Sequence, residues 1–221
     1  MINIDEILNS PLEEDPWPHI VVDNVLDKNS LESCKRICKD ILNANEFHEK
    51  ETIWMSDVLK LGVNLSDVNN IINDADVLVK NYESISNIFP NSLKSNLGYF
   101  NNPRIGMSMA KSIGEVHDEG TNKVMAFVIY LEPEESLGTL LFKDKNTFSK
   151  EVKWKQNRGL LFFSQPEKTW HSFNSTDHIR LTLNFYYEKI EALNHLNKNS
   201  TADQLSWLHE KLGNNTLVKY V

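Results

Sequence analysis

The sequence predicts an α+β protein in which helices flank a β sandwich or barrel. Apolar residues recur at helical spacing through much of the first 90 residues. From Leu97 to Glu188 the chain becomes a series of short apolar strands separated by turn residues, and helical spacing returns after Thr201. We therefore expect a single domain over residues 1–221: a flank at 1–96, a β core at 97–188 and a C-terminal helix within 189–221.

The composition excludes several classes of function. With 40% hydrophobic and 24% charged residues, the chain has the make-up of an ordinary globular protein. Its formal net charge of −8, without a Lys/Arg-rich block, disfavours binding to nucleic acid or to an anionic membrane. No apolar run reaches the roughly 18 residues of a membrane span, and no signal peptide is visible, so we expect a cytoplasmic protein. The oligomeric state is left open.

The N-terminal flank is predicted to hold one strand and two helices. The strand lies in PWPHIVVDNVL, Pro16–Leu26. In the next helix Asn29 and Glu32 fit a capping box. Its buried stripe comprises Leu31, Cys34, Cys38 and Ile41. We interpret the two cysteines as buried thiols, with a disulfide or metal pair as the alternative. A second helix is expected from about Ser66 to Phe89, before Pro90.

Six strands are predicted in the core: RIGMSMA (104–110), KVMAFVIYL (123–131), GTLLF (138–142), VKW (152–154), GLLFF (159–163) and IRLTLNFYY (179–187). KVMAFVIYL is apolar on both faces, as expected of a central strand. In IRLTLNFYY the apolar residues alternate with Arg180, Thr182, Asn184 and Tyr186, so one face packs and the other is polar. The C-terminal helix begins near Thr201, where Gln204 completes a capping box ahead of an apolar stripe at Leu205, Leu208 and Leu212.

The stretch GEVHDEGTNK carries the candidate chemistry. In an extended strand His117 and Glu119 point to one face and Asp118 to the other. Asp118 stays an alternative to Glu119, because Gly120 permits a kink in the backbone. His171, in TWHSF, is the candidate third ligand. Two imidazoles and one carboxylate form the facial triad of non-haem Fe(II), whereas structural zinc takes four protein ligands.

Arg180 follows His171 by nine residues. A guanidinium on the inner face of a β core is costly to bury unpaired, and a carboxylate ligand would satisfy it with a two-pronged hydrogen bond. Thr182, on the same face, adds a hydroxyl. In the alternative interpretation, Arg180 lies on an outer, solvated face. The remaining histidines are expected in loops or helices, as surface or structural residues: His19, His48, His178, His195 and His209.

Together these motifs resemble the 2-oxoglutarate- and Fe(II)-dependent oxygenases, especially the prolyl-hydroxylase-like branch. The stretches that carry the resemblance are HDEGTNKVMAFVIYLEPE, LGTLLF, RGLLFFSQPEKTWHSF and HIRLTLNFYY, and PWPHIVVDNVLDKNSLE is similar to the branch's entry strand and helix. The resemblance implies a double-stranded β-helix (a cupin-like jelly roll). It also implies that His117, Glu119 and His171 bind Fe(II), and that Arg180 and Tyr130 hold the distal carboxylate of 2-oxoglutarate. Thr182 matches a hydroxyl position of some branches.

The implied activity is that of a dioxygenase. It would use dioxygen and 2-oxoglutarate to hydroxylate an unactivated C–H bond of a small molecule or peptidyl side chain, with release of succinate and carbon dioxide. Glu119 departs from the family's usual HxD, yet retention of a carboxylate favours hydroxylation over halogenation. Two alternatives stay open: a catalytically inactive or differently metallated cupin-like binding module, and an interaction protein with a purely structural core. The substrate cannot be read from the sequence; candidates for the pocket wall are Asn101, Asn102, Lys123, Trp154, Trp170 and Asn184.

Overall fold

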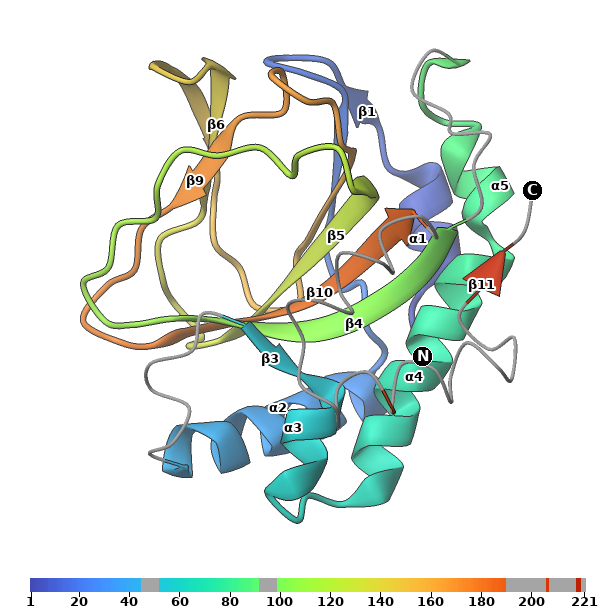
Figure 1. Ribbon diagram of the computed structural model, residues 1–221, viewed down its shortest axis with the longest axis vertical. Coiled ribbons are helices and arrows are strands. Elements are labelled where there is room, and N and C mark those ends of the chain that lie inside the picture. Colours follow the sequence, from blue (N-terminus) through green and yellow to red (C-terminus); the bar gives the residue numbers. More distant parts are fainter. Residues whose placement is uncertain (45–51, 92–98, 190–205, 207–217, 220–221) are drawn as a thin grey trace.

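The computed structural model describes residues 1–44, 52–91, 99–189, 206 and 218–219 (Figure 1). The helices are α1 (Ile4–Asn9), α2 (Lys28–Asn43), α3 (Met55–Lys60), α4 (Leu65–Lys80) and α5 (Tyr82–Ser86). The strands are β1 (Leu12–Glu13), β2 (His19–Val22), β3 (Thr52–Trp54), β4 (Tyr99–Ser108), β5 (Lys123–Glu132), β6 (Thr139–Asp144), β7 (Thr147–Val152), β8 (Gly159–Phe163), β9 (His171–Phe173), β10 (Arg180–Lys189) and β11 (Val218–Lys219). No helix in these ranges is long and apolar enough to cross a membrane.

The strands form two sheets in which every pairing is antiparallel. The larger sheet runs β1-β2-β8-β5-β10-β4-β11, with β3 paired to β4 as well, and the smaller runs β7-β6-β9. In Figure 1 the smaller sheet stands on one side of the β5-β10-β4 layer, and helices α2, α3 and α4 lie on the other. The predicted α+β class is confirmed, and the β core is antiparallel.

Two apolar clusters fill the two sides of the larger sheet. On the helix side, Leu183 and Phe185 of β10 belong to one cluster with Cys34 and Cys38 of α2 and Leu78 of α4. Both cysteines are free and fully buried, as predicted, and burial raises the pKa of each thiol. On the opposite side, residues of β5 and β8 pack against the smaller sheet; they include Ala126, Tyr130, Leu160 and Phe162, which meet Leu141 and Val152.

Strand β10 carries the polar alternation that the sequence predicts. Leu181, Leu183 and Phe185 face the helix-side core, while the residues between them line a cavity. Thr182 lies opposite Gly106 of β4. A Cβ atom at Gly106 would stand 2.6 Å from both Thr182 Oγ1 and Asn184 Nδ2, so the glycine leaves room for the polar side chains of β10.

Several local predictions were wrong. Helix α2 is capped by Asp27, whose carboxylate accepts a hydrogen bond from Ser30 N at 2.8 Å, so the Asn29–Glu32 box does not form. The second predicted helix divides at Asn81 into α4 and α5. The strand expected at VKW ends at Val152, as the last residue of β7. The helix predicted from Thr201 lies outside the described residues, apart from position 206.

Of the five other histidines, two lie in the described ranges. His178 is exposed in the β9–β10 connection, as expected. His19 was wrongly expected in a loop or helix. It begins β2 and is fully buried, with its Nδ1 2.7 Å from the Trp17 carbonyl oxygen. His48, His195 and His209 lie outside the described residues.

Candidate metal centre

His117 and His171 are brought together by backbone pairing. They form an antiparallel bridge in which His117 N donates to His171 O at 3.0 Å and His171 N donates to His117 O at 2.9 Å. Their ring centroids lie 4.5 Å apart. The bridge joins the loop after β4 to the start of β9, so the two imidazoles are fixed by the sheet backbone and do not depend on a bound ion for their approach.

The hydrogen bonds of the two imidazoles define which nitrogen is free. Nδ1 of His117 lies 2.8 Å from the Glu115 carbonyl oxygen, and Nδ1 of His171 lies 2.8 Å from the Thr169 carbonyl oxygen. A carbonyl oxygen only accepts, so each Nδ1 carries a proton and Nε2 is the ring nitrogen left to bind a metal. This arrangement is typical of histidines that bind a metal through Nε2.

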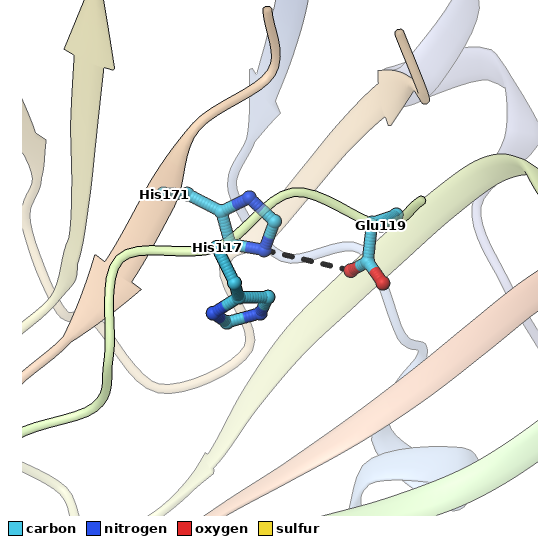
Figure 2. A group of neighbouring side chains, drawn as sticks. All are labelled: His117, Glu119 and His171. Atoms are coloured by element: carbon cyan, nitrogen blue, oxygen red, sulfur yellow. Dashed lines mark ion pairs between the residues drawn. The ribbon is translucent and has the colours of Figure 1, made fainter. Parts of the chain in front are cut away.

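Glu119 completes the group (Figure 2). Its Oε1 lies 3.5 Å from His171 Nε2, and one ligand atom from each of His117, Glu119 and His171 lies within 4.8 Å of the others. Two imidazoles and one carboxylate in this arrangement could hold a divalent transition metal.

Asp118 has a different role. Its Oδ1 accepts a hydrogen bond from Gly120 N at 2.8 Å, and its Oδ2 accepts one from Glu167 N at 2.6 Å. These bonds tie the loop that carries His117 to the turn before His171. Between the two neighbouring acids, the structure therefore groups Glu119 with the histidines and leaves Asp118 to fix the backbone.

The electrostatics keep this group in the form that binds a metal. Burial alone would raise the pKa of the Glu119 carboxyl, but Lys123 and His171 hold it well below its usual range. Lys123 Nζ donates to Glu119 Oε2. Burial, with the neighbouring His171, lowers the pKa of His117. The carboxylate is therefore ionised and the His117 imidazole neutral at pH 7.

The three side chains open onto a cavity of about 390 Å³. Its wall includes Arg180, Thr182, Asn184 and Tyr186 of β10, together with Thr139 of β6 and the apolar Val128, Leu160 and Phe162. A space of this size is at the small end of ligand pockets. Of the residues named from sequence as candidates for the wall, Asn184 lines the cavity, while Lys123 contacts the acid of the metal group.

Arg180 is buried inside, which excludes the alternative of an outer, solvated face. It is 5% exposed, and no acidic side chain in the described ranges pairs with it. Its Nη2 donates to Thr139 Oγ1 at 3.4 Å, whereas its Nε has no hydrogen-bond partner among the described residues. Burial lowers the pKa of Arg180, yet a guanidinium stays charged at neutral pH. An anionic ligand would offset the cost of burying this charge.

Tyr130 lies beside Arg180, behind Thr139. Its hydroxyl donates to Thr139 Oγ1 at 2.7 Å, and its ring stacks on Trp154 with centroids 4.5 Å apart. The Arg180 guanidinium carbon lies 5.4 Å from the Tyr130 ring centroid. Thr139 thus joins Tyr130 to Arg180 and faces the cavity itself. The sequence analysis did not single out Thr139, although it predicted the strand GTLLF that carries this residue.

No protein-family model matches this sequence, and no curated protein matches it either. Solved structures of the same fold include prolyl hydroxylases. A viral collagen prolyl hydroxylase from Paramecium Bursaria Chlorella virus-1, in complex with 2OG, superposes with a TM-score of 0.54 at 10% identity, over 78% of this chain and 96% of that chain.

Two further structures support the same fold. A prolyl 4-hydroxylase from Phytophthora capsici gives a TM-score of 0.57 at 9% identity, over 86% of this chain and 67% of that one. A prolyl hydroxylase from Trichoplax adhaerens, in complex with a hypoxia inducible factor peptide fragment, gives a TM-score of 0.52 at 12% identity, over 78% of this chain and 84% of that one. At these identities the likeness shows a shared fold.

Proposed function

We propose that this protein is an Fe(II)- and 2-oxoglutarate-dependent dioxygenase that hydroxylates a C–H bond of a small molecule or peptidyl side chain. The observation that carries the proposal is that His117, Glu119 and His171 open onto the same cavity as Arg180, which is buried and forms no ion pair with a described residue. The shared fold supports it, since one solved prolyl hydroxylase contains 2OG and another a peptide. We extend the proposal to a jelly-roll core within a single domain over residues 1–221.

The donor set fits Fe(II). Two imidazoles and one carboxylate are the ligands of non-haem Fe(II) oxygenases, and three protein ligands on one face leave other coordination positions open. Structural zinc would need a fourth protein ligand, usually a thiolate. The two cysteines lie on α2, in the apolar core on the helix side of the larger sheet.

The buried guanidinium fits the distal carboxylate of 2-oxoglutarate. Within the part of the chain that the structure describes, Arg180 Nε has no hydrogen-bond partner, and the Thr182 and Thr139 hydroxyls line the same cavity. We assign Arg180 as the main anchor, with Thr139, Tyr130 and Thr182 in support. Arg180 would then gain a charge-assisted, two-pronged hydrogen bond that offsets its desolvation.

Fe(II) bound here, together with 2-oxoglutarate and dioxygen, would supply the oxidising chemistry, with succinate and carbon dioxide as coproducts. The chain itself positions the reactants and excludes water. Val128, Leu160 and Phe162 form an apolar wall beside the metal group, and the Phe162 ring lies 5.2 Å from the His171 ring. Such a wall strengthens the electrostatic contacts within the cavity, because it lowers the local dielectric.

The experiment that tests this function measures succinate. Protein reconstituted with Fe(II) should convert 2-oxoglutarate to succinate slowly without substrate, and faster when a screen of metabolites and peptides reaches the right one. His171→Ala should abolish this turnover, while His178→Ala, which changes an exposed histidine, should not. A protein that binds Fe(II) and 2-oxoglutarate but yields no succinate under any condition would be the non-catalytic binding module instead.

A further inference from the structure

The carboxylate of Glu119 is divided between two partners. Oε1 faces His171 Nε2 at 3.5 Å, whereas Oε2 accepts a hydrogen bond from Lys123 Nζ. Both side chains of this ion pair are largely buried, with 4% of Glu119 and 20% of Lys123 exposed. The pair is therefore shielded from the solvent screening that makes exposed ion pairs weak. Oε2 is therefore held by Lys123, and Oε1 is directed toward the histidines.

Lys123 is itself held in place. Its ammonium lies 3.6 Å from the centroid of the Tyr186 ring, within the range of a strong cation–π contact. The Arg104 guanidinium lies 5.6 Å from the same ring and 4.5 Å from the Trp54 ring. Arg104 also donates to Glu188 Oε1 at 2.8 Å. The Tyr186 ring of β10 thus supports the lysine that contacts the metal group, and Arg104 of β4 lies near the same ring.

We propose that Lys123 is a positioning residue that holds Glu119 so that a single carboxylate oxygen faces the metal. The inference rests on the proposed function. Glutamate has one more rotatable bond than aspartate, so its carboxylate needs more restraint to be presented in one orientation. The Lys123 ammonium supplies that restraint, because it binds the Oε2 oxygen and does so away from the histidines.

The restraint matters for the number of open positions. A carboxylate that binds a metal through both oxygens occupies two coordination positions. A six-coordinate ion with three protein ligands has three positions left, which a chelating cosubstrate and dioxygen together would fill. With Oε2 engaged by Lys123, Glu119 takes one position and all three others stay open.

The test uses Co²⁺ as the probe, titrated into metal-free protein and followed by its visible absorption, with thermal unfolding measured alongside. Lys123→Met keeps the length of the side chain but removes its charge. We expect it to weaken Co²⁺ affinity about 10- to 100-fold and to shift the cobalt bands. Lys123→Arg should restore most of the affinity. Lys80→Met is the matched control, because Lys80 pairs with Asp76 at the same i,i+4 spacing on an exposed face.

The outcomes separate this role from the metal site itself. If wild-type protein binds Co²⁺ and Lys123→Met binds it with unchanged affinity and unchanged bands, the positioning role is overturned and the proposed function stands. If wild-type protein binds no Co²⁺, the metal site and the role both fail. Should Lys123→Met not fold, Tyr186→Leu tests the same point. Loss of the ring beside the ammonium should weaken Co²⁺ binding about fivefold, and unchanged binding would overturn the role.

Discussion

His117 and His171 exchange two backbone hydrogen bonds, of 3.0 and 2.9 Å, and their imidazole centroids lie 4.5 Å apart. Two candidate metal ligands are therefore part of one β-bridge. Because strand pairing fixes the relative position of the two imidazoles, the entropy cost of ordering them arises on folding and not on metal binding. Metal-free protein is expected to be folded and ready to bind.

Amide substitution of the two neighbouring acids should change different properties: metal affinity for Glu119 and stability for Asp118. Glu119→Gln should weaken metal affinity at least about tenfold, since it removes the anionic ligand. Asp118→Asn should leave metal affinity unchanged but lower the free energy of unfolding by about 1 kcal/mol, because it weakens the bonds from Gly120 N and Glu167 N. Titration with Co²⁺ and urea denaturation measure the two effects. Loss of metal binding only in Asp118→Asn would reverse the assignment.

Arg180→Met should stabilise the metal-free protein and destroy cosubstrate binding. Replacing a buried charge that pairs with no described carboxylate by an apolar side chain should raise the free energy of unfolding by about 1 kcal/mol. The affinity for 2-oxoglutarate should fall at least about 30-fold, with metal affinity little changed. Arg158→Met is the control. It should not raise the free energy of unfolding, because it breaks a partly exposed ion pair with Asp23. A destabilised Arg180→Met that binds 2-oxoglutarate normally would contradict the anchor role.

Thr139→Val tests the link between Tyr130 and Arg180. The hydroxyl of Thr139 accepts hydrogen bonds from Tyr130 at 2.7 Å and from Arg180 at 3.4 Å, and valine has nearly the same shape without it. We expect 2-oxoglutarate to bind about tenfold more weakly in the presence of metal. Thr147→Val, at an exposed position of β7, should bind it as the wild type does. Equal binding by both variants would remove Thr139 from the anchor.

Acid stability should depend on Asp23. Its carboxylate accepts hydrogen bonds from Arg158 at 2.6 Å and from Lys155 at 2.8 Å, which lower the pKa of Asp23 from 3.8 to about 2. A lowered pKa contributes stability above pH 3.8 that is lost as the pH falls toward 2. Asp23→Asn should cost about 1 kcal/mol at pH 7 and less at pH 3, measured by urea denaturation. A constant difference between the two pH values would contradict this linkage.

Patterns within one segment were predictable from the sequence, because they follow from local geometry. The period-2 alternation of β10 predicted that Arg180 and Thr182 lie on the inner face. The same alternation predicted that Glu119 and Asp118 point to opposite faces. The cap of α2 was predicted wrongly, since Asp27 and Asn29 are both favoured cap residues near its start and Asp27 makes the capping hydrogen bond. The break at Asn81 was missed as well.

Contacts between distant segments could not be derived from local patterns. The bridge between His117 and His171 depends on long-range strand pairing that spacing alone does not reveal. The same holds for Thr139, which reaches Arg180 from the smaller sheet, and for the Tyr186 ring beside Lys123. Each of these contacts is set by register and by side-chain packing across strands that are not consecutive in the chain.

The most direct test of the central claim is an anaerobic titration of the metal-free protein with Fe(II) and then with 2-oxoglutarate, followed by calorimetry. We predict one Fe(II) per chain and 2-oxoglutarate binding that requires the metal, with both lost in His171→Ala and both kept in His178→Ala. Wild-type protein that binds neither ligand, or His171→Ala that binds both as tightly as the wild type, would contradict the account.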